Sequence, residues 1–165
     1  LFKDRVYVFT PRGEVIDLPT GSTPLDFAYR IHTEVGHRCR GAKVNGKLVN
    51  LEYQLQNGDR VEILTAKHGG PSRDWLNPHL GYIQTSRAKN KIRQWFRQQA
   101  REENIAAGRE LLERELNRLG MDDLTYEEIA SLFGFARLDD FLAALGCNEI
   151  TTIQVAEHVL KLGQT

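Results

Sequence analysis

Six side chains that can carry charge, bind a metal ion or stack on a nucleobase fall within a short stretch of this 165-residue chain. They are Arg30, His32, His37, Arg38, Cys39 and Arg40. The histidines and the cysteine could ligate zinc together with His68 or His79. Zinc sites that a sequence reveals are built from close pairs such as Cys-x-x-Cys, however, and this chain has none. We therefore expect no metal site and interpret the cluster as a polar helix end.

The same cluster has the composition of a surface that binds single-stranded RNA. RNA ends are held by cations on phosphates and by planar side chains on bases, each stacked base contributing ~1–3 kcal/mol. Arginine, histidine and the neighbouring Tyr29 are suited to both tasks. The competing interpretation is a solvated helix end, where an arginine or two hydrogen-bond the last carbonyl groups. Composition alone leaves both interpretations open.

Motifs of enzyme chemistry do not accompany the cluster. The chain has no glycine-rich phosphate loop, no Gly-x-Ser-x-Gly and no His-Glu-x-x-His. A turn at 10–13 presents Thr10, Arg12 and backbone N–H groups, which could cradle a phosphate or a ribose. A plain Pro-Gly turn accounts for the same residues. We expect no catalytic residue and no cofactor in this chain.

Charge is distributed unevenly along the chain, although the formal net charge is zero. Residues 1–66 carry a net of +1, residues 67–109 a net of +6 and residues 110–165 a net of −7. The basic middle includes Arg87, Lys91 and Arg97 on a predicted helix, where they could follow a phosphate backbone. A solvated face is the usual explanation of such a run, but charge of one sign favours a polyanionic partner. The acidic end argues against nucleic acid there.

The elements that must position the cluster belong to a predicted α+β fold. Arg5–Thr10 and Glu14–Leu18 alternate as the strands of a hairpin, and Ala42–Val44, Lys47–Val49 and Arg60–Thr65 follow as further strands. One helix intervenes, so residues 3–66 predict a β-grasp domain, with a helix packed across a mixed sheet. That helix begins with the capping box Thr23-x-x-Asp26 and is predicted to end at Gly36.

The remainder predicts a helical domain behind a linker. Residues 67–82 contain several glycines and prolines and are predicted to form the linker. Trp75 and Leu76 would pack it against a neighbouring element. An all-α domain at 83–165 would contain a basic helix to about Arg101, a second helix over Asn104–Leu119 and three short helices. The last part resembles a helix-turn-helix, but Asp139 and Asp140 at the start of its reading helix would repel a phosphate backbone.

Cellular context follows from what the chain lacks. Two cysteines far apart in sequence predict no disulfide. Neither a signal peptide nor an apolar run long enough to cross a membrane is visible, so we expect a cytoplasmic protein without a membrane partner. Because the chain begins Leu-Phe-Lys, we expect it to be an excerpt of a longer protein.

Two long motifs carry a family resemblance. DRVYVFTPRGEVIDLPTGSTPLDFAYRIHTEVGHRCRGAKVNG resembles the TGS domain of RelA/SpoT-type stringent-response proteins. SRDWLNPHLGYIQTSRAKNKIRQWFRQQ resembles the helical region that follows it in RelA-like members. The likeness extends from Lys3 to about Leu119, and the remaining residues match only by position. Several RelA-like relatives have histidine where this chain has Arg30.

The resemblance implies a function for the cluster. The parent enzyme would be a guanosine tetraphosphate (ppGpp) synthetase, an ATP:GTP 3′-diphosphotransferase whose catalytic domains lie upstream. This part would be a regulatory module without chemistry of its own, which binds the 3′ CCA end of deacylated tRNA on the ribosome. The RNA-binding residues would be Thr10, Arg30, His32, His37, Arg38, Arg40, Arg87, Lys91 and Arg97. The alternatives are a module that binds acyl carrier protein, or one that restrains the upstream catalytic domains.

Overall fold

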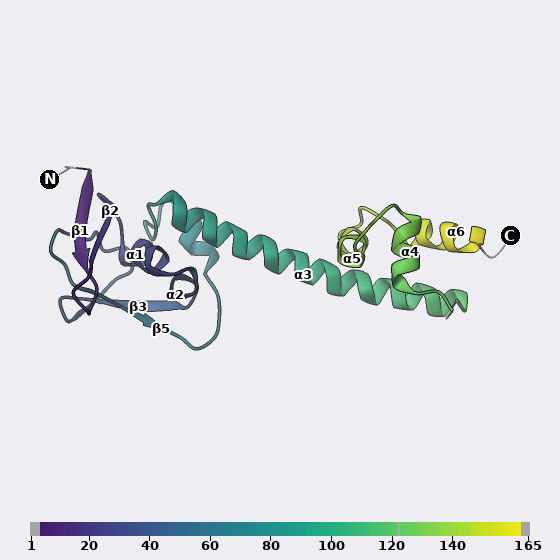
Figure 1. Ribbon diagram of the computed structural model, residues 1–165, viewed down its shortest axis with the longest axis horizontal. Helices are drawn as coiled ribbons and strands as arrows, with labels where there is room; N and C mark the ends of the chain where they lie inside the picture. The colour runs from purple at the N-terminus through teal and green to yellow at the C-terminus, as the bar shows by residue number, and fades with distance from the viewer. Residues whose placement is uncertain (1–3, 122, 163–165) are drawn as a thin grey trace. The chain divides into compact units, whose positions relative to one another are not determined.

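The computed structural model describes residues 4–121 and 123–162, which form two compact units. The N-terminal unit comprises residues 1–96, and the helical unit comprises residues 97–165. Figure 1 shows strands and short helices in the first and helices alone in the second. No helix in the described part of the chain is both long enough and apolar enough to cross a membrane.

The N-terminal unit is a β-grasp with two small antiparallel sheets. Strand β1 (Arg5–Phe9) pairs with β2 (Val15–Pro19), and β3 (Cys39–Val44) lies between β4 (Lys47–Val49) and β5 (Val61–Thr65). A parallel bridge from Phe9 to Arg60 joins the two sheets, which confirms the predicted α+β fold. The Asn-Gly turn between β3 and β4 has positive φ at both residues, as a type I′ turn requires.

Two helices, where the sequence predicts one, follow the hairpin. Helix α1 (Pro24–Ile31) begins with the predicted capping box, in which Thr23 and Asp26 exchange hydrogen bonds. The predicted end at Gly36 is wrong: His32 adopts an extended conformation, and α2 (Thr33–His37) starts directly after it. Gly36 lies inside α2, where a Cβ atom would overlap the Tyr29 ring. The glycine is therefore explained by close packing instead of a helix stop.

Helix α1 is buried on two sides by two apolar clusters. One joins Phe27 to the strands through residues such as Val8, Leu18 and Val61. The other surrounds Leu25, Ala28 and Tyr29 with residues that come much later in the chain, namely Trp75, Ile83, Ala88 and Ile92. Ile31, the last residue of α1, is 41% exposed.

The segment after β5 packs as part of the N-terminal unit. It contains a 3₁₀ helix, η1 (Arg73–Leu76), whose Trp75 is buried in the second cluster as predicted. This compact unit continues to Phe96, beyond residue 66, at which the predicted domain ends.

Helix α3 (Ser86–Leu119) is continuous, so the predicted division into two helices near 102–103 is wrong. Arg101, Glu102 and Glu103 are all acceptable helix formers, and neither proline nor glycine interrupts them.

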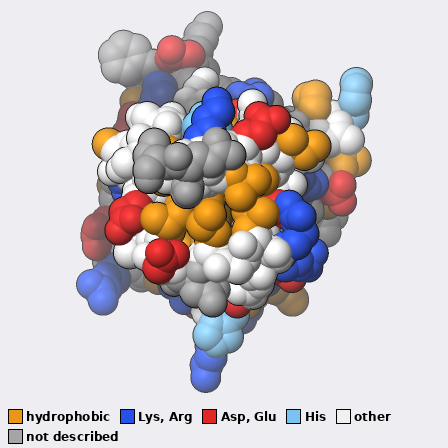
Figure 2. All heavy atoms as spheres, turned by 90° about the vertical axis from the view of Figure 1, so that its right-hand side faces the viewer, with side chains coloured by type: hydrophobic (Ala, Val, Ile, Leu, Met, Phe, Trp, Pro, Cys, Tyr) orange, Lys and Arg blue, Asp and Glu red, His pale blue; other side chains and the backbone are white. Residues whose placement is uncertain are grey.

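The helical unit contains the three short helices that the sequence predicts. They are α4 (Tyr126–Leu132), α5 (Leu138–Gly146) and α6 (Thr152–Leu162). Gly108 of α3 lies against the Leu142 carbonyl and Gly146 of α5 against the Asn104 carbonyl, with no room for a Cβ atom at either glycine. Figure 2 shows apolar side chains gathered on one face of this unit, whose exposed apolar residues include Leu132, Ile153 and Leu160.

Candidate nucleic-acid interface

The break between α1 and α2 exposes three consecutive residues. Arg30 and Ile31 are the last two residues of α1, His32 follows them, and all three are exposed. The His32 ring caps α2, because its Nδ1 accepts a hydrogen bond from the Glu34 amide at 3.0 Å. Arg38 caps the other end of α2 and is half-buried. The break thus brings a guanidinium, an apolar side chain and an imidazole together on one exposed corner.

His37 lies in the interior instead. The residue is only 6% exposed. Its ring Nδ1 lies 2.9 Å from the hydroxyl of the fully buried Tyr29. The ring also packs near Trp95, with 6.3 Å between the centroids. Burial lowers the pKa of His37, Lys91 lowers it further, and Glu34 opposes the shift. A neutral, enclosed imidazole supports the helices from behind and does not present itself to a ligand.

Arg40 ties the start of β3 to the segment that follows β5. Its guanidinium donates to the carbonyls of Cys39 at 2.7 Å, His37 at 3.3 Å and Gly70 at 3.1 Å. Gly70 in turn has no space for a Cβ atom, because the Trp95 ring lies against it. Burial raises the pKa of the Cys39 thiol to about 11, so the thiol stays protonated at neutral pH.

Thr10 organises the hairpin turn that the sequence singled out. Its Oγ1 accepts from the Glu14 amide at 3.1 Å, and its carbonyl accepts from the Gly13 amide at 2.9 Å. Gly13 has a φ of +87°, which the turn requires. Both Thr10 oxygens therefore take part in closing the turn.

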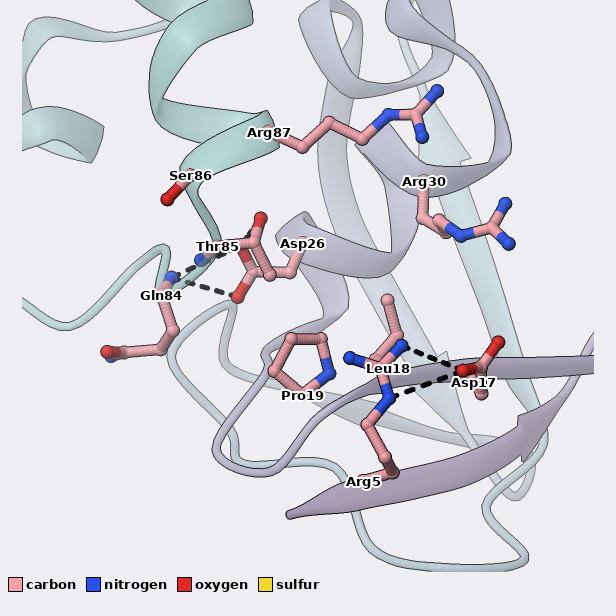
Figure 3. A pocket seen from close by; sticks show the side chains of 10 residues that line it. All are labelled: Arg5, Asp17, Leu18, Pro19, Asp26, Arg30, Gln84, Thr85, Ser86 and Arg87. Atoms are coloured by element: carbon pink, nitrogen blue, oxygen red, sulfur yellow. Dashed lines mark hydrogen bonds and ion pairs between the residues drawn. The ribbon is translucent and has the colours of Figure 1, made fainter.

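A cavity of about 390 Å³ lies beside Arg30, within the N-terminal unit. Arg5 and Asp17 of the hairpin, the end of α1 and the start of α3 contribute to its wall. Figure 3 shows the Arg5 guanidinium hydrogen-bonded to the Asp17 carboxylate, at 2.8 and 3.2 Å. The Arg5 hydrogen bond, with help from the nearby Arg5 and Arg30 charges, lowers the pKa of Asp17. Arg87 lines the same cavity, so α3 brings one predicted RNA-binding residue next to another.

Asp26 holds the wall of this cavity together. Its carboxylate accepts hydrogen bonds from the amides of Gln84 at 2.9 Å and Thr85 at 3.0 Å, and from the Thr85 hydroxyl at 2.9 Å. It also accepts from the Thr23 amide at 3.0 Å, which completes the capping box. One buried carboxylate therefore fixes the start of α1 and the approach to α3.

Sequence reasoning missed the contribution of Arg5, Asp17 and 84–86 to this wall. The capping box predicts one role of Asp26, but no local pattern predicts contacts 58 positions along the chain.

The two remaining predicted residues lie on α3. Lys91 is half-buried and close enough to His37 to act on its charge. Arg97 belongs to the helical unit, where it lines a groove with Arg101 and Asp140, themselves ion-paired at 2.6 Å. Arg30, His32 and Arg87 are thus exposed in one unit; Arg40 is also exposed but its guanidinium is bonded to backbone carbonyls, and His37 is buried.

A metal centre has no basis in the described residues. Within 4–121 and 123–162, no three His, Cys, Asp or Glu side chains lie close enough to hold an ion. Cys39 and Cys147 are free thiols, the first buried and the second exposed. The chemistry that the exposed groups offer is that of binding: positive charge, hydrogen-bond donors and planar rings.

Comparison with known proteins assigns both units. Residues 6–65 match the TGS domain, and residues 95–160 match the RelA/SpoT AH domain. The GTP pyrophosphokinase of Escherichia coli (strain K12) is 54% identical over 160 residues, covering 96% of this chain and 22% of that protein. The GTP pyrophosphokinase of Haemophilus influenzae is 54% identical over 151 residues, covering 91% and 20%.

A relative named for a different activity is about as similar to this chain. The probable guanosine-3′,5′-bis(diphosphate) 3′-pyrophosphohydrolase of Synechocystis is 50% identical over 163 residues, covering 96% of this chain and 21% of that protein. The chain therefore spans about a fifth of the length of the curated relatives that it matches.

Residues 6–65 of the N-terminal unit are accordingly a TGS domain, and they have a β-grasp fold. The chain as a whole belongs to the RelA/SpoT family, of which it carries the TGS domain and the following AH domain. This confirms the predicted resemblance. Neither matched domain is a catalytic domain, and the activity names belong to the longer relatives.

Proposed function

We propose that this chain is the RNA-sensing regulatory module of a ppGpp synthetase, and that it binds the 3′ CCA end of deacylated tRNA on the ribosome. The names of its longer relatives support GTP pyrophosphokinase as the activity of the parent protein. The proposed partners are the tRNA, the ribosome and the catalytic domains of the same chain, and their compartment is the cytoplasm.

The observation that carries the proposal is the exposed corner at the break between α1 and α2. Arg30 supplies a positive charge for a phosphate, and the His32 ring supplies a planar surface for a base. Ile31, 41% exposed between them, adds apolar area against which a base can lie. A single-stranded end needs these three kinds of contact and no deep pocket.

The distribution of charge supports the same surface. The N-terminal unit has 15 Lys and Arg against 9 Asp and Glu, a net of +6, while the helical unit has 7 against 13, a net of −6. RNA binding depends on neutralised phosphates, so the N-terminal unit carries the binding and the helical unit contributes little.

His37 and Arg40 serve this surface indirectly. His37 and Tyr29 fix α2 against α1, and Arg40 fixes the end of α2 through its carbonyl contacts. We assign His37 and Arg40 to positioning, and Arg30, His32 and Arg38 to contact.

The proposal is tested by the affinity of the chain for deacylated tRNA, measured by fluorescence anisotropy. His32→Asn keeps an effective N-cap for α2 but removes the ring, so binding weakens about tenfold while the thermal midpoint stays close to that of the wild type. Arg38→Gln removes one phosphate contact, so the slope of log affinity against log salt falls by about 0.7.

Lys47→Gln is the matched control, because Lys47 is exposed on β4 in the same unit but distant in sequence from the corner. It should change affinity less than twofold. Equal losses in Lys47→Gln and Arg38→Gln would show that only the overall charge matters, and the proposed site would be wrong.

A second candidate is a protein-interaction module, favoured by the net charge of +6 on the N-terminal unit. An acidic partner such as acyl carrier protein would be attracted to the same surface. In competition with labelled tRNA, an excess of acyl carrier protein that displaces the RNA would support this candidate, and lack of displacement would exclude it.

If the module instead restrains the catalytic domains, deleting it from the parent protein would raise basal synthesis without RNA.

A further inference from the structure

We propose that the cavity between the hairpin, the end of α1 and the start of α3 is a phosphate-binding site, with Arg30 and Arg87 as its cationic ligands. The phosphate belongs either to an RNA backbone or to a free nucleotide. Where it is that of RNA, the inference rests on the function proposed above.

The charges at the cavity leave two guanidinium groups available. Arg5 is held by Asp17, and the two groups offset each other's charge. Asp26 is buried and already accepts hydrogen bonds from Thr23, Gln84 and Thr85. Among the described residues, neither the Arg30 nor the Arg87 guanidinium makes a side-chain hydrogen bond or an ion pair, and both residues are exposed. Figure 3 shows both side chains extending to the same side of the view.

The lining fits a phosphate better than it fits a base. It contains no aromatic side chain on which a base could stack, and Leu18 and Pro19 are its apolar members. The volume of about 390 Å³ accommodates a phosphate or pyrophosphate with its hydration. Arginine presents a planar fork of donors that matches phosphate oxygens, which makes two available guanidinium groups a favourable ligand pair.

The start of α3 contributes Arg87 and not its helix end. Helix α3 starts at Ser86 beside the cavity, and the amides of Gln84 and Thr85 before it already donate to the Asp26 carboxylate. The attraction for an anion therefore comes from the two guanidinium groups. A bound phosphate would connect α1 to α3 through Arg30 and Arg87.

Calorimetric titration of the whole chain with inorganic pyrophosphate tests the site. Arg30→Gln and Arg87→Gln are each expected to weaken pyrophosphate binding about tenfold or more, since each removes one charge-assisted contact. Arg93→Gln is the control: it removes the same charge from an exposed position of the same helix that does not line the cavity. It should change the affinity less than twofold.

A second arm identifies the source of the phosphate. Displacement of pyrophosphate by an oligonucleotide ending in CCA, with weaker RNA binding in Arg30→Gln and Arg87→Gln, assigns the site to the RNA backbone. Displacement by guanosine diphosphate but not by the oligonucleotide, with unchanged RNA affinity in Arg87→Gln, assigns it to a free nucleotide.

The outcomes separate this inference from the proposed function. Pyrophosphate that does not bind, or equal weakening by Arg93→Gln, overturns the phosphate site, even if the wild-type chain still binds tRNA. Pyrophosphate binding that depends on Arg30 and Arg87 upholds the site, even if the chain fails to bind tRNA, a failure that would count against the proposed function alone.

Discussion

His32 and His37 lie five positions apart and differ in almost every physical respect. His32 is exposed at the break between two helices, where its ring caps α2 and remains accessible from outside. His37 is enclosed by Tyr29 and Trp95, and its neutral form is favoured. The first can therefore contact a ligand, whereas the second determines how firmly the helices that carry the ligand site are held.

The lowered pKa of His37 predicts a pH dependence of stability. The unfolded chain takes up a proton near pH 6.5, the ordinary histidine value, while the folded chain resists protonation there. The stability that the neutral ring contributes is thus fully present above pH 6.5 and is lost as the pH falls through the folded pKa. We expect the free energy of unfolding to decrease from pH 7.5 to pH 5.

Urea unfolding of His37→Asn and His32→Asn at both pH values checks this assignment. The wild type should lose stability on acidification, and His32→Asn serves as a variant that lacks a different histidine. The loss should be smaller in His37→Asn, which starts from a lower stability at pH 7.5. If acidification lowered the free energy of unfolding by the same amount in all three proteins, carboxyl groups and not His37 would be responsible.

At the scale of elements, the buried carboxylate of Asp26 decides where α1 and α3 begin. Residues 84 and 85 form no strand and no helix, so their amides need partners from elsewhere, and Asp26 supplies them. The apolar contacts of Ala88 and Ile92 with Leu25 and Tyr29 then keep the first turns of α3 in the N-terminal unit.

Replacing Asp26 should therefore cost far more stability than replacing another acid nearby. Asp26→Ala leaves the amides of Thr23, Gln84 and Thr85 without their acceptor in a buried place, and we expect a loss of about 3–5 kcal/mol. Asp17→Ala breaks a pair whose side chains are 33% and 47% exposed, and about 0–1 kcal/mol is expected. Urea denaturation measures both, and hydrogen exchange of the first turn of α3 should accelerate in Asp26→Ala alone. Similar losses in the two variants would contradict the role assigned to Asp26.

Local patterns predicted several elements correctly and failed where distant contacts decide. Thr23 and Asp26 form a capping box because four consecutive residues suffice for it, and the Asn45-Gly46 turn is equally local. The break after Ile31 could not be predicted. Gly36 lies where a glycine would end a single helix, but it is a glycine because the Tyr29 ring leaves no room for a Cβ atom there. Arg30 and Arg87 come together only through the fold, so their cavity was beyond the reach of the sequence.

For the molecule as a whole, charge divides along the same boundary as structure. The basic N-terminal unit and the acidic helical unit carry net charges of +6 and −6, which a neutral total conceals. Arg30 and His32, which we propose as RNA contacts, belong to the TGS domain, whereas the AH domain packs its own apolar core from α3 to α6. We accordingly assign RNA recognition to the first unit.

The central claim is that the chain recognises the 3′ end of an uncharged tRNA. It is tested most directly by measuring the affinity of the whole chain for one tRNA in three forms: deacylated, aminoacylated, and trimmed of its terminal CCA. Deacylated tRNA should bind most tightly, and the trimmed form at least about tenfold more weakly, because each lost stacking contact is worth ~1–3 kcal/mol. The aminoacylated form should also bind more weakly than the deacylated form. Equal affinity for the deacylated and trimmed forms would contradict the claim.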